Sequence, residues 1–323
     1  MTTKMVAVAI AALVVVGGSA AAYVLLSDDK NDAGDPYLSI TNSIGTTVNF
    51  YEPAQKVASM GLSFSTTLLE LGCLDDMVMI DTYSAPGNSG ISELGSIPSY
   101  SVGDGQQIAQ ILANGIGGFD KKRDVVFVYG YSYNANAIQS MEALGLKVVT
   151  YYPTTYEAGM EMVTSIGEIM DLNDEALAIT DAMGSALTDY AQKLADNGIV
   201  EGSKVRAAYV SYSLSNMKIG NINSYSVILM KIAGGANPAD DGTMSGTSLT
   251  SYSVDHTFFL QMNIGVIFLD PYYTGTPEEF RSAMSIPANV QIYHLEMVMN
   301  QYGPTSLDGI QFMAEKMYPG IFV

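Results

Sequence analysis

Apolar positions recur at three- and four-residue spacing over a long stretch in the middle of the chain, residues 173–198. This spacing predicts one buried helical face, formed by Ala176, Ile179, Met183, Leu187, Tyr190 and Leu194. Asn173 is a good N-cap at its start, and Asn197-Gly198 at its end tolerates the left-handed C-cap conformation. At ~1.5 Å per residue, the pattern predicts a single helix roughly 36 Å long.

On both sides of this helix, strand-like apolar runs alternate with helix-like segments. The predicted strands are 37–40, 46–50, 56–60, 77–82, 124–129, 147–152, 204–210, 265–270 and 290–295. The predicted helices are 63–71, 106–113, 134–144, 156–170, 224–233, 255–262, 277–284 and 305–317. Such alternation predicts two α/β lobes with mainly parallel sheets, joined by one long backbone helix. In such sheets, ligands bind beyond the carboxyl ends of the strands.

The first apolar run has a different character. Met5–Leu26 carries no charge and follows Lys4; as a helix it would span ~33 Å, enough to cross a ~30 Å hydrocarbon layer. The preceding positive charge favours a cytoplasmic N-terminus and an external body. Ala20-Ala21-Ala22 offers a signal-peptidase site, but Tyr23–Leu26 continues the apolar run beyond it. We therefore expect an N-terminal transmembrane or signal helix, preferably an uncleaved anchor, and an exported body at the cell surface or in the periplasm.

These patterns divide the chain into four parts. We expect a signal or membrane anchor with a linker at 1–36, an N-terminal α/β lobe at 37–172, the connecting helix at 173–198 and a C-terminal α/β lobe at 199–323. The formal net charge is −19, from 33 acidic and 14 basic residues, which disfavours nucleic acid as a partner. Cys73 is the only cysteine, so neither an intramolecular disulfide nor a multi-cysteine metal site can form.

Tyrosines gather in the loops that follow the predicted strands. The chain has 21 tyrosines and no tryptophan. A tyrosine offers a flat apolar face and one hydroxyl while losing little rotamer freedom, which suits a site for a large, partly apolar ligand. The alternative is that these tyrosines serve only the strands. The candidate ligand-binding residues of this kind are Tyr83, Tyr129, Tyr131, Tyr133, Tyr212, Tyr252, Tyr272 and Tyr273.

Five short segments, in order and at characteristic spacing around the central helix, carry a family resemblance. They are Ile40–Val48, Lys56–Gly72, Met141–Val148, Ile232–Asn237 and Gly265–Asp270. With them the chain resembles the substrate-binding proteins of ABC importers for siderophores, cobalamin and haem, the periplasmic binding proteins with one long helix between two lobes. The resemblance covers roughly residues 38–322.

This resemblance implies capture of a ligand without chemistry, and so neither an enzyme nor a resident cofactor. It implies that an iron or cobalt chelate binds between the lobes and is delivered to a membrane permease and its ATPase. It also adds Ser63 to the candidate ligand-binding residues, and it allows iron ligation by a phenolate if the ligand is haem. Where the family often carries a docking glutamate, this chain has Thr66, and Glu70 lies one turn later.

Two other readings remain open at this stage. A metal chelatase-like enzyme of the same fold would need a base beside its metal, and only His256 and His294 could supply an imidazole. His256 is the one candidate metal ligand among them, although a histidine in an apolar helix is more often a hydrogen-bonded structural group. The third reading is a cell-surface protein without a transport function, which predicts no stabilisation by ligands.

Overall fold

The computed structural model describes residues 34–210, 217–240 and 250–322. The expected N-terminal transmembrane or signal helix and Tyr212 lie outside these residues. Within them, no helix is long and apolar enough to cross a membrane.

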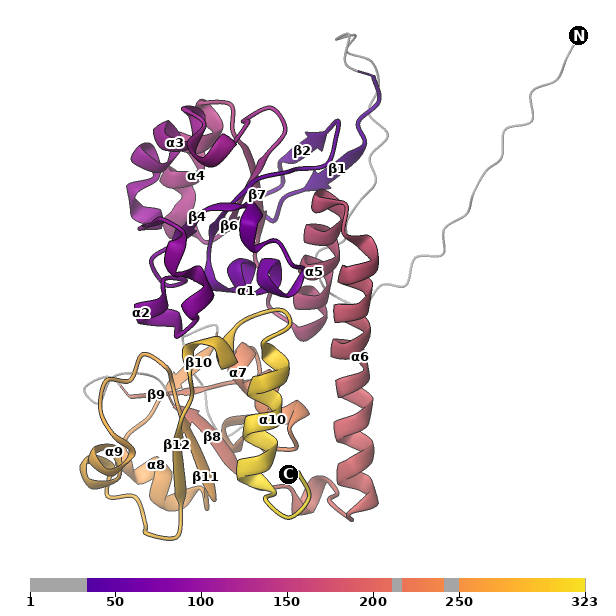
Figure 1. Ribbon diagram of the computed structural model, residues 1–323. Coiled ribbons are helices and arrows are strands. Elements are labelled where there is room, and N and C mark those ends of the chain that lie inside the picture. The colour runs from indigo at the N-terminus through magenta and orange to yellow at the C-terminus, as the bar shows by residue number, and fades with distance from the viewer. Residues whose placement is uncertain (1–33, 211–216, 241–249, 323) are drawn as a thin grey trace, which may run out of the picture.

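The first lobe is built on a five-stranded parallel sheet of order β5-β4-β3-β6-β7 (Figure 1). Its strands are β3 (Val57–Met60), β4 (Met77–Asp81), β5 (Ser99–Tyr100), β6 (Val125–Tyr129) and β7 (Lys147–Tyr151). Its helices are α1 (Leu62–Glu70), α2 (Pro86–Ser89), α3 (Gly105–Ala113), α4 (Ala135–Ala143) and α5 (Tyr156–Met170). Alternate strand residues bury against α1 and α5 on one face and against α3 and α4 on the other. This double burial explains why the strands read as continuous apolar runs.

A separate antiparallel hairpin, β1 (Leu38–Thr41) and β2 (Thr47–Phe50), precedes the first sheet. Gly45 adopts the positive φ of 86° that the turn requires. The buried Asn42 ties the hairpin to β7, because its amide donates to Val148 O at 2.9 Å and accepts from Thr150 N at 2.9 Å.

The second lobe has the corresponding strand order, β10-β9-β8-β11-β12, in which one strand, β9, runs opposite to the other four. Its strands are β8 (Ala207–Val210), β9 (Lys218–Gly220), β10 (Ser251–Ser253), β11 (Val266–Leu269) and β12 (Gln291–His294). Its helices are α7 (Tyr225–Ile232), α8 (His256–Gln261), α9 (Pro277–Met284) and α10 (Ser306–Met317). β8, β11 and β12 are parallel, whereas β9 and β10 pair antiparallel. The sequence pattern missed β5, β9 and β10, which have only two or three residues each and carry no detectable period.

The predicted connecting helix is α6 (Asn173–Asp196), 24 residues long, and it runs beside both lobes (Figure 1). Leu172, not Asn173, occupies the N-cap position, and the helix ends two residues before the predicted end. Ala176, Met183 and Leu194 are buried as the spacing predicts. The expected fold of two α/β lobes with mainly parallel sheets joined by a long helix is therefore confirmed.

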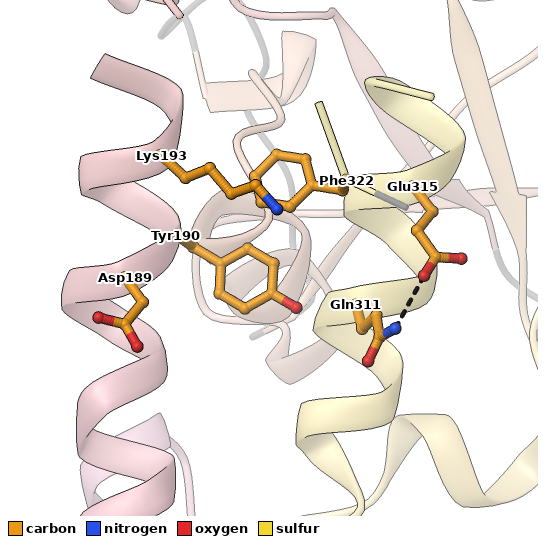
Figure 2. A pocket seen from close by; sticks show the side chains of 6 residues that line it. All are labelled: Asp189, Tyr190, Lys193, Gln311, Glu315 and Phe322. Atoms are coloured by element: carbon orange, nitrogen blue, oxygen red, sulfur yellow. Dashed lines mark hydrogen bonds between the residues drawn. The ribbon is translucent and has the colours of Figure 1, made fainter. Parts of the chain in front are cut away.

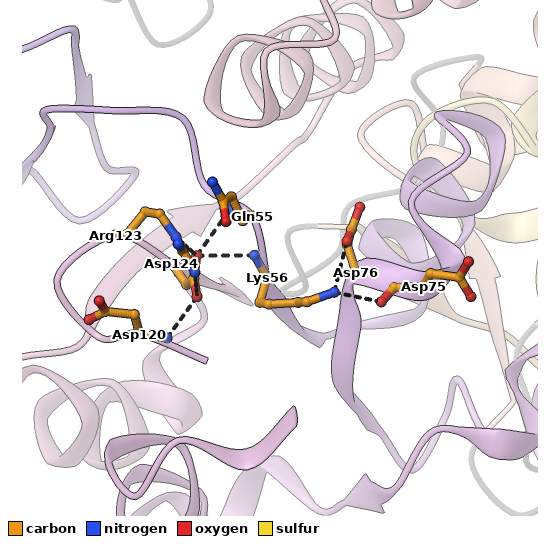
Figure 3. Close-up of polar contacts among 7 residues, drawn as sticks. All are labelled: Gln55, Lys56, Asp75, Asp76, Asp120, Arg123 and Asp124. Atoms are coloured by element: carbon orange, nitrogen blue, oxygen red, sulfur yellow. Dashed lines mark hydrogen bonds and ion pairs between the residues drawn. The ribbon is translucent and has the colours of Figure 1, made fainter. Parts of the chain in front are cut away.

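A buried ion pair holds the amino end of the first-lobe sheet, where its strands begin (Figure 3). Asp124 is fully buried and accepts hydrogen bonds from the backbone N–H groups of Gln55, Lys56 and Asp120 and from the Arg123 guanidinium, at 2.7–3.0 Å. Burial alone would raise the pKa of Asp124, but Arg123 and these donors outweigh it and hold the pKa below its ordinary value. The Lys56 ammonium beside it bonds Asp76 at 3.0 Å.

Candidate functional site

The turns after β4 and β11 bring the carboxyl ends of the two sheets together. Tyr83 from the first lobe and Tyr272 from the second lie edge to face, with ring centroids 5.9 Å apart and an interplanar angle of 88°. Both rings remain about half exposed. Because both come from turns at carboxyl strand ends, they mark the place where α/β sheets bind ligands.

Each of these tyrosines follows a buried aspartate by two residues. Asp81 accepts hydrogen bonds from Tyr83 N at 3.3 Å, Ser84 N at 3.1 Å and the Ser84 hydroxyl at 2.5 Å. Asp270 accepts from Tyr272 N at 2.7 Å and from the Tyr209 hydroxyl. Burial raises the pKa of both carboxyl groups above the ordinary value. The two aspartates thus shape the turns that present the tyrosine pair.

The loop after β6 adds a row of tyrosines on the first-lobe side. Tyr131 stacks on Tyr133 at 5.1 Å and 22°, and meets Tyr152 edge to face at 5.0 Å. Tyr129 lies 5.3 Å behind Tyr131. Tyr133 is 77% exposed, so its ring is available to a ligand. Burial, followed by the electrostatic effects of Tyr83 and Tyr152, raises the pKa of Tyr133 above its ordinary value.

An arm of the second lobe, residues 295–305 between β12 and α10, reaches onto the first lobe. The Ser63 hydroxyl at the start of α1 accepts from Tyr302 N at 3.0 Å and donates to the Gln301 amide oxygen at 3.2 Å. It also accepts from the Tyr129 hydroxyl at 2.6 Å. Tyr302 itself packs against Tyr129, with ring centroids 6.3 Å apart. The predicted ligand residues Ser63 and Tyr129 therefore hold the two lobes together in this structure.

We call the region around the Tyr83–Tyr272 pair, where the carboxyl ends of the two sheets meet, the junction. A polar network lies under its second-lobe side. The buried Tyr209 hydroxyl donates to Asp270 and accepts from the Asn300 amide at 3.1 Å. The Asn300 amide oxygen accepts in turn from the Ser226 hydroxyl at 2.6 Å. This network fixes the arm to β8 and holds Asp270 in its turn.

The remaining candidates lie elsewhere in the second lobe. Tyr252 is in the edge strand β10, and Tyr273 is buried against Phe280 and next to His294. His294 Nε2 lies 2.8 Å from Tyr273 O. His256 is exposed at the start of α8, where Asp255 caps the helix. The structure thus gathers Tyr83, Tyr131, Tyr133 and Tyr272 at the junction and places Tyr252 and His256 apart from them.

Several junction residues escaped the sequence reasoning: Asp81, Tyr152, Tyr209, Asp270, Gln301 and Tyr302. Asp81 and Tyr209 were absorbed into predicted strands, although an acidic residue at the last position of an apolar strand is a usable signal. Tyr302 precedes Gly303-Pro304 in a segment without helix or strand period.

No group of three or more His, Cys, Asp or Glu side chains in the described part of the chain could hold a metal ion. Burial, followed by the electrostatic effects of Tyr83, Asp270 and Asp81, raises the pKa of Tyr272 to about 12, so this phenol is protonated at neutral pH. Neutral hydroxyls donate hydrogen bonds and leave ring faces for stacking.

A different surface cavity, of about 220 Å³, lies between α6 and α10 (Figure 2). Phe322 stacks there on Tyr190 at 5.1 Å and lies under the Lys193 ammonium at 4.8 Å. These contacts attach the C-terminal residues to the connecting helix, and the cavity lies away from the junction tyrosines.

No protein-family model and no curated protein sequence matches the chain. Solved structures do match. They include Helicobacter pylori CeuE with Ni(II) bound, at 18% identity and a TM-score of 0.68, covering 88% of this chain and 90% of that one. A periplasmic solute-binding protein from Veillonella parvula has 15% identity and a TM-score of 0.64, covering 88% and 87%. A periplasmic haem-binding protein from Pseudomonas aeruginosa has 17% identity and a TM-score of 0.64, covering 83% and 94%. The fold is that of the periplasmic solute-binding proteins of ABC transporters.

Proposed function

We propose that this protein is the extracytoplasmic substrate-binding component of an ABC transporter, capturing a metal chelate between its lobes. The observation that carries the proposal is the meeting of half-exposed tyrosines from both lobes, Tyr83 and Tyr272, at the carboxyl ends of two sheets. The fold shared with solute-binding proteins supports this reading. The ligand classes in question are ferric siderophores, cobalamin and haem.

Capture would use ring faces and neutral hydroxyls. Tyr83, Tyr131, Tyr133 and Tyr272 would stack on the ligand and donate hydrogen bonds, joined by Tyr152. Ser63 and Tyr129 would act indirectly, because their hydroxyls already bond each other and the arm. A bulky chelate would separate Tyr83 from Tyr272 or bind beside them.

Delivery would require docking on a permease that works with an ATPase. Thr66, at the position where the family often carries its docking glutamate, is buried and donates to Ser63 O at 3.1 Å, so it is not a docking residue. Glu70 is exposed at the end of α1 and is the nearest carboxylate on that helix. The expected anchoring through residues 5–26 would keep the protein beside the permease.

Thermal unfolding of the full-length chain with each ligand class tests the proposal. A ligand that binds only the folded state at 100 times its Kd stabilises by about 2.7 kcal/mol. Tyr83→Ala with Tyr272→Ala should weaken this stabilisation, whereas Tyr51→Ala, an exposed tyrosine after β2, should not. Unchanged melting curves with haem, cobalamin and ferric siderophores would contradict capture and favour a surface protein without transport.

A further inference from the structure

The carboxyl ends of both sheets are acidic. Asp81 is the last residue of β4, and the charged residues in the described segments from β4, β6, β7, β11 and β12 to the next named strand or to α4, α5, α9 and α10 are Glu93, Asp270 and Glu296. Asp81 and Asp270 are buried, and both act on the half-exposed Tyr272. Any ligand against the Tyr83–Tyr272 pair therefore lies beside two carboxyl groups from opposite lobes.

Basic residues are found at the other ends of the sheets. Of the 14 in the chain, Lys4 and Lys30 lie outside the described residues, which leaves twelve. Eleven of these precede or begin parallel strands, or lie in the last turns of helices that return to the amino ends: Lys56, Lys121, Lys122, Arg123, Lys147, Lys193, Lys204, Arg206, Lys231, Arg281 and Lys316. Several already have partners there, as in Arg123 with Asp124 and Lys231 with Asp240.

Lys218 is the one described exception. It begins β9, which runs antiparallel to β8, so it lies at the carboxyl end of the second-lobe sheet. One strand, β8, lies between β9 and β11, the strand that leads to Asp270. The sequences of 211–216 and 241–249, which connect strands of this lobe, contain neither lysine nor arginine. Among the described residues, no basic side chain lies in the segments that follow β4, β6, β7, β11 and β12 at the tyrosine-lined part of the junction.

The start of α1 is not open to an anion either. A helix N-terminus would normally attract negative charge through its free N–H groups. Here Ser63 N, in the first turn of α1, donates to the Tyr129 hydroxyl at 3.4 Å, and Tyr129 and Tyr302 pack over it. The ligand instead meets tyrosine faces, whose negative quadrupole attracts cations.

We propose that the ligand carries no net negative charge, and that a cationic or uncharged chelate binds against the tyrosine rings. This inference rests on the proposed function and narrows its ligand class. An anionic chelate would lose its hydration without gaining a basic partner at this site, and would face Asp81 and Asp270. Haem, with two carboxylates, and ferric tris-catecholates are therefore disfavoured relative to uncharged cobalamin and to uncharged or cationic ferric hydroxamates.

A charge series on one chelate tests the inference. A linear ferric trihydroxamate with a free terminal amine carries +1, its acetylated form is uncharged, and its succinylated form carries −1, with the same iron coordination throughout. Titration of the full-length chain, followed by tyrosine fluorescence, should give the +1 and uncharged forms at least about tenfold tighter binding than the −1 form. Added salt should weaken binding of the +1 form most.

Two variants check that the junction sets this preference. Tyr133→Arg, at a 77% exposed position, should raise the affinity of the −1 form relative to the +1 form by about tenfold. Tyr51→Arg, the same change at an exposed tyrosine away from the junction, should leave the ratio unchanged. Asp81→Asn should lower the ratio of the affinity for the +1 form to the affinity for the −1 form.

The outcomes separate the two proposals. Equal binding across the series, tighter binding of the −1 form, or stabilisation by haem alone overturns the charge inference and leaves capture standing. Stabilisation by cobalamin alone supports it. If neither the series nor haem nor cobalamin binds, the proposed function fails and the inference fails with it.

Discussion

At the amino end of the first-lobe sheet, the buried Asp124 faces Arg123, whereas at the carboxyl end the equally buried Asp81 faces only hydroxyl and amide donors. The pKa of Asp124 is lowered and that of Asp81 is raised. At the amino end, the carboxylate of Asp124 is stabilised by a cationic partner, Arg123. At the carboxyl end, Asp81 has hydrogen-bond donors but no cationic partner among them. A buried carboxyl group with a raised pKa at a strand end is a candidate site residue, which agrees with the ligand site proposed at the carboxyl end.

Asp124→Ala, at the amino end of the sheet, should have the largest effect of these variants on the free energy of unfolding. It removes the acceptor of five hydrogen bonds and leaves the Arg123 guanidinium without its partner, and it should lower the free energy of unfolding by about 3–5 kcal/mol. Denaturant unfolding measures the loss. Asp120→Ala, which removes an exposed carboxylate bonded to Lys122 N, is the matched control and should cost about 0.5 kcal/mol or less.

Ser63→Ala probes the carboxyl end at the point where the arm attaches. The Tyr129 hydroxyl and Tyr302 N lose their acceptor, which should cost about 2 kcal/mol. Amide hydrogen exchange should rise in residues 297–303 of the second lobe while the β3 amides stay protected. If exchange rises equally throughout β3, the arm is not held mainly by Ser63. Ser140→Ala, which removes a bond within α4, is the control.

A double-mutant cycle on Tyr83→Ala and Tyr272→Ala should give a coupling free energy between the two rings that is smaller than the effect of Ser63→Ala. Edge-to-face aromatic pairs contribute about 0.5–1.5 kcal/mol beyond their buried area. Unfolding of both single variants and the double variant gives the coupling energy. A coupling energy of zero would mean that the two rings are neighbours but do not stabilise the contact between the lobes. The arm would then be the contact that holds the lobes together on this side.

The smallest expected effect is a pH dependence of opposite sign at the two ends. Asp81 has a folded pKa above its ordinary value, so its contribution to stability grows as pH falls through that pKa. Asp124 has a folded pKa below its ordinary value, so its contribution is present at neutral pH and is lost as pH falls through that pKa. Unfolding of the wild type and of Asp81→Asn between pH 7 and pH 4 should show the wild type gaining relative to the variant. A constant difference would contradict the raised pKa.

Much of the fold followed from the sequence, because long buried elements carry a strong period. The helix 156–170 was predicted at its observed bounds, and α6 within two residues, since burial repeats along one face in each. The strands β5, β9 and β10 were not predicted, because two or three residues paired at an edge need no apolar pattern. The hairpin and the tyrosines after β6 were predictable from turn residues and loop position.

The candidate site was only partly predictable. Loop position directed attention to Tyr83 and Tyr272, but nothing local shows that their rings meet, because the two residues are 189 positions apart along the chain. Ser63, a predicted ligand residue, accepts a hydrogen bond from Tyr302 N in this structure, and the sequence could not show this because Tyr302 is 239 positions away along the chain. The role of Tyr302 depends wholly on the path of the arm.

The arm and α6 connect the lobes at separate places. Two points of attachment define a line, and a rigid body held at two points can turn only about that line. Relative motion of the halves should therefore resemble a narrow rocking, with the aromatic rings at the rim moving furthest and Ser63 scarcely moving. The ligand proposed above would then reach the junction past the 77% exposed Tyr133, with little change in the distance between the lobes.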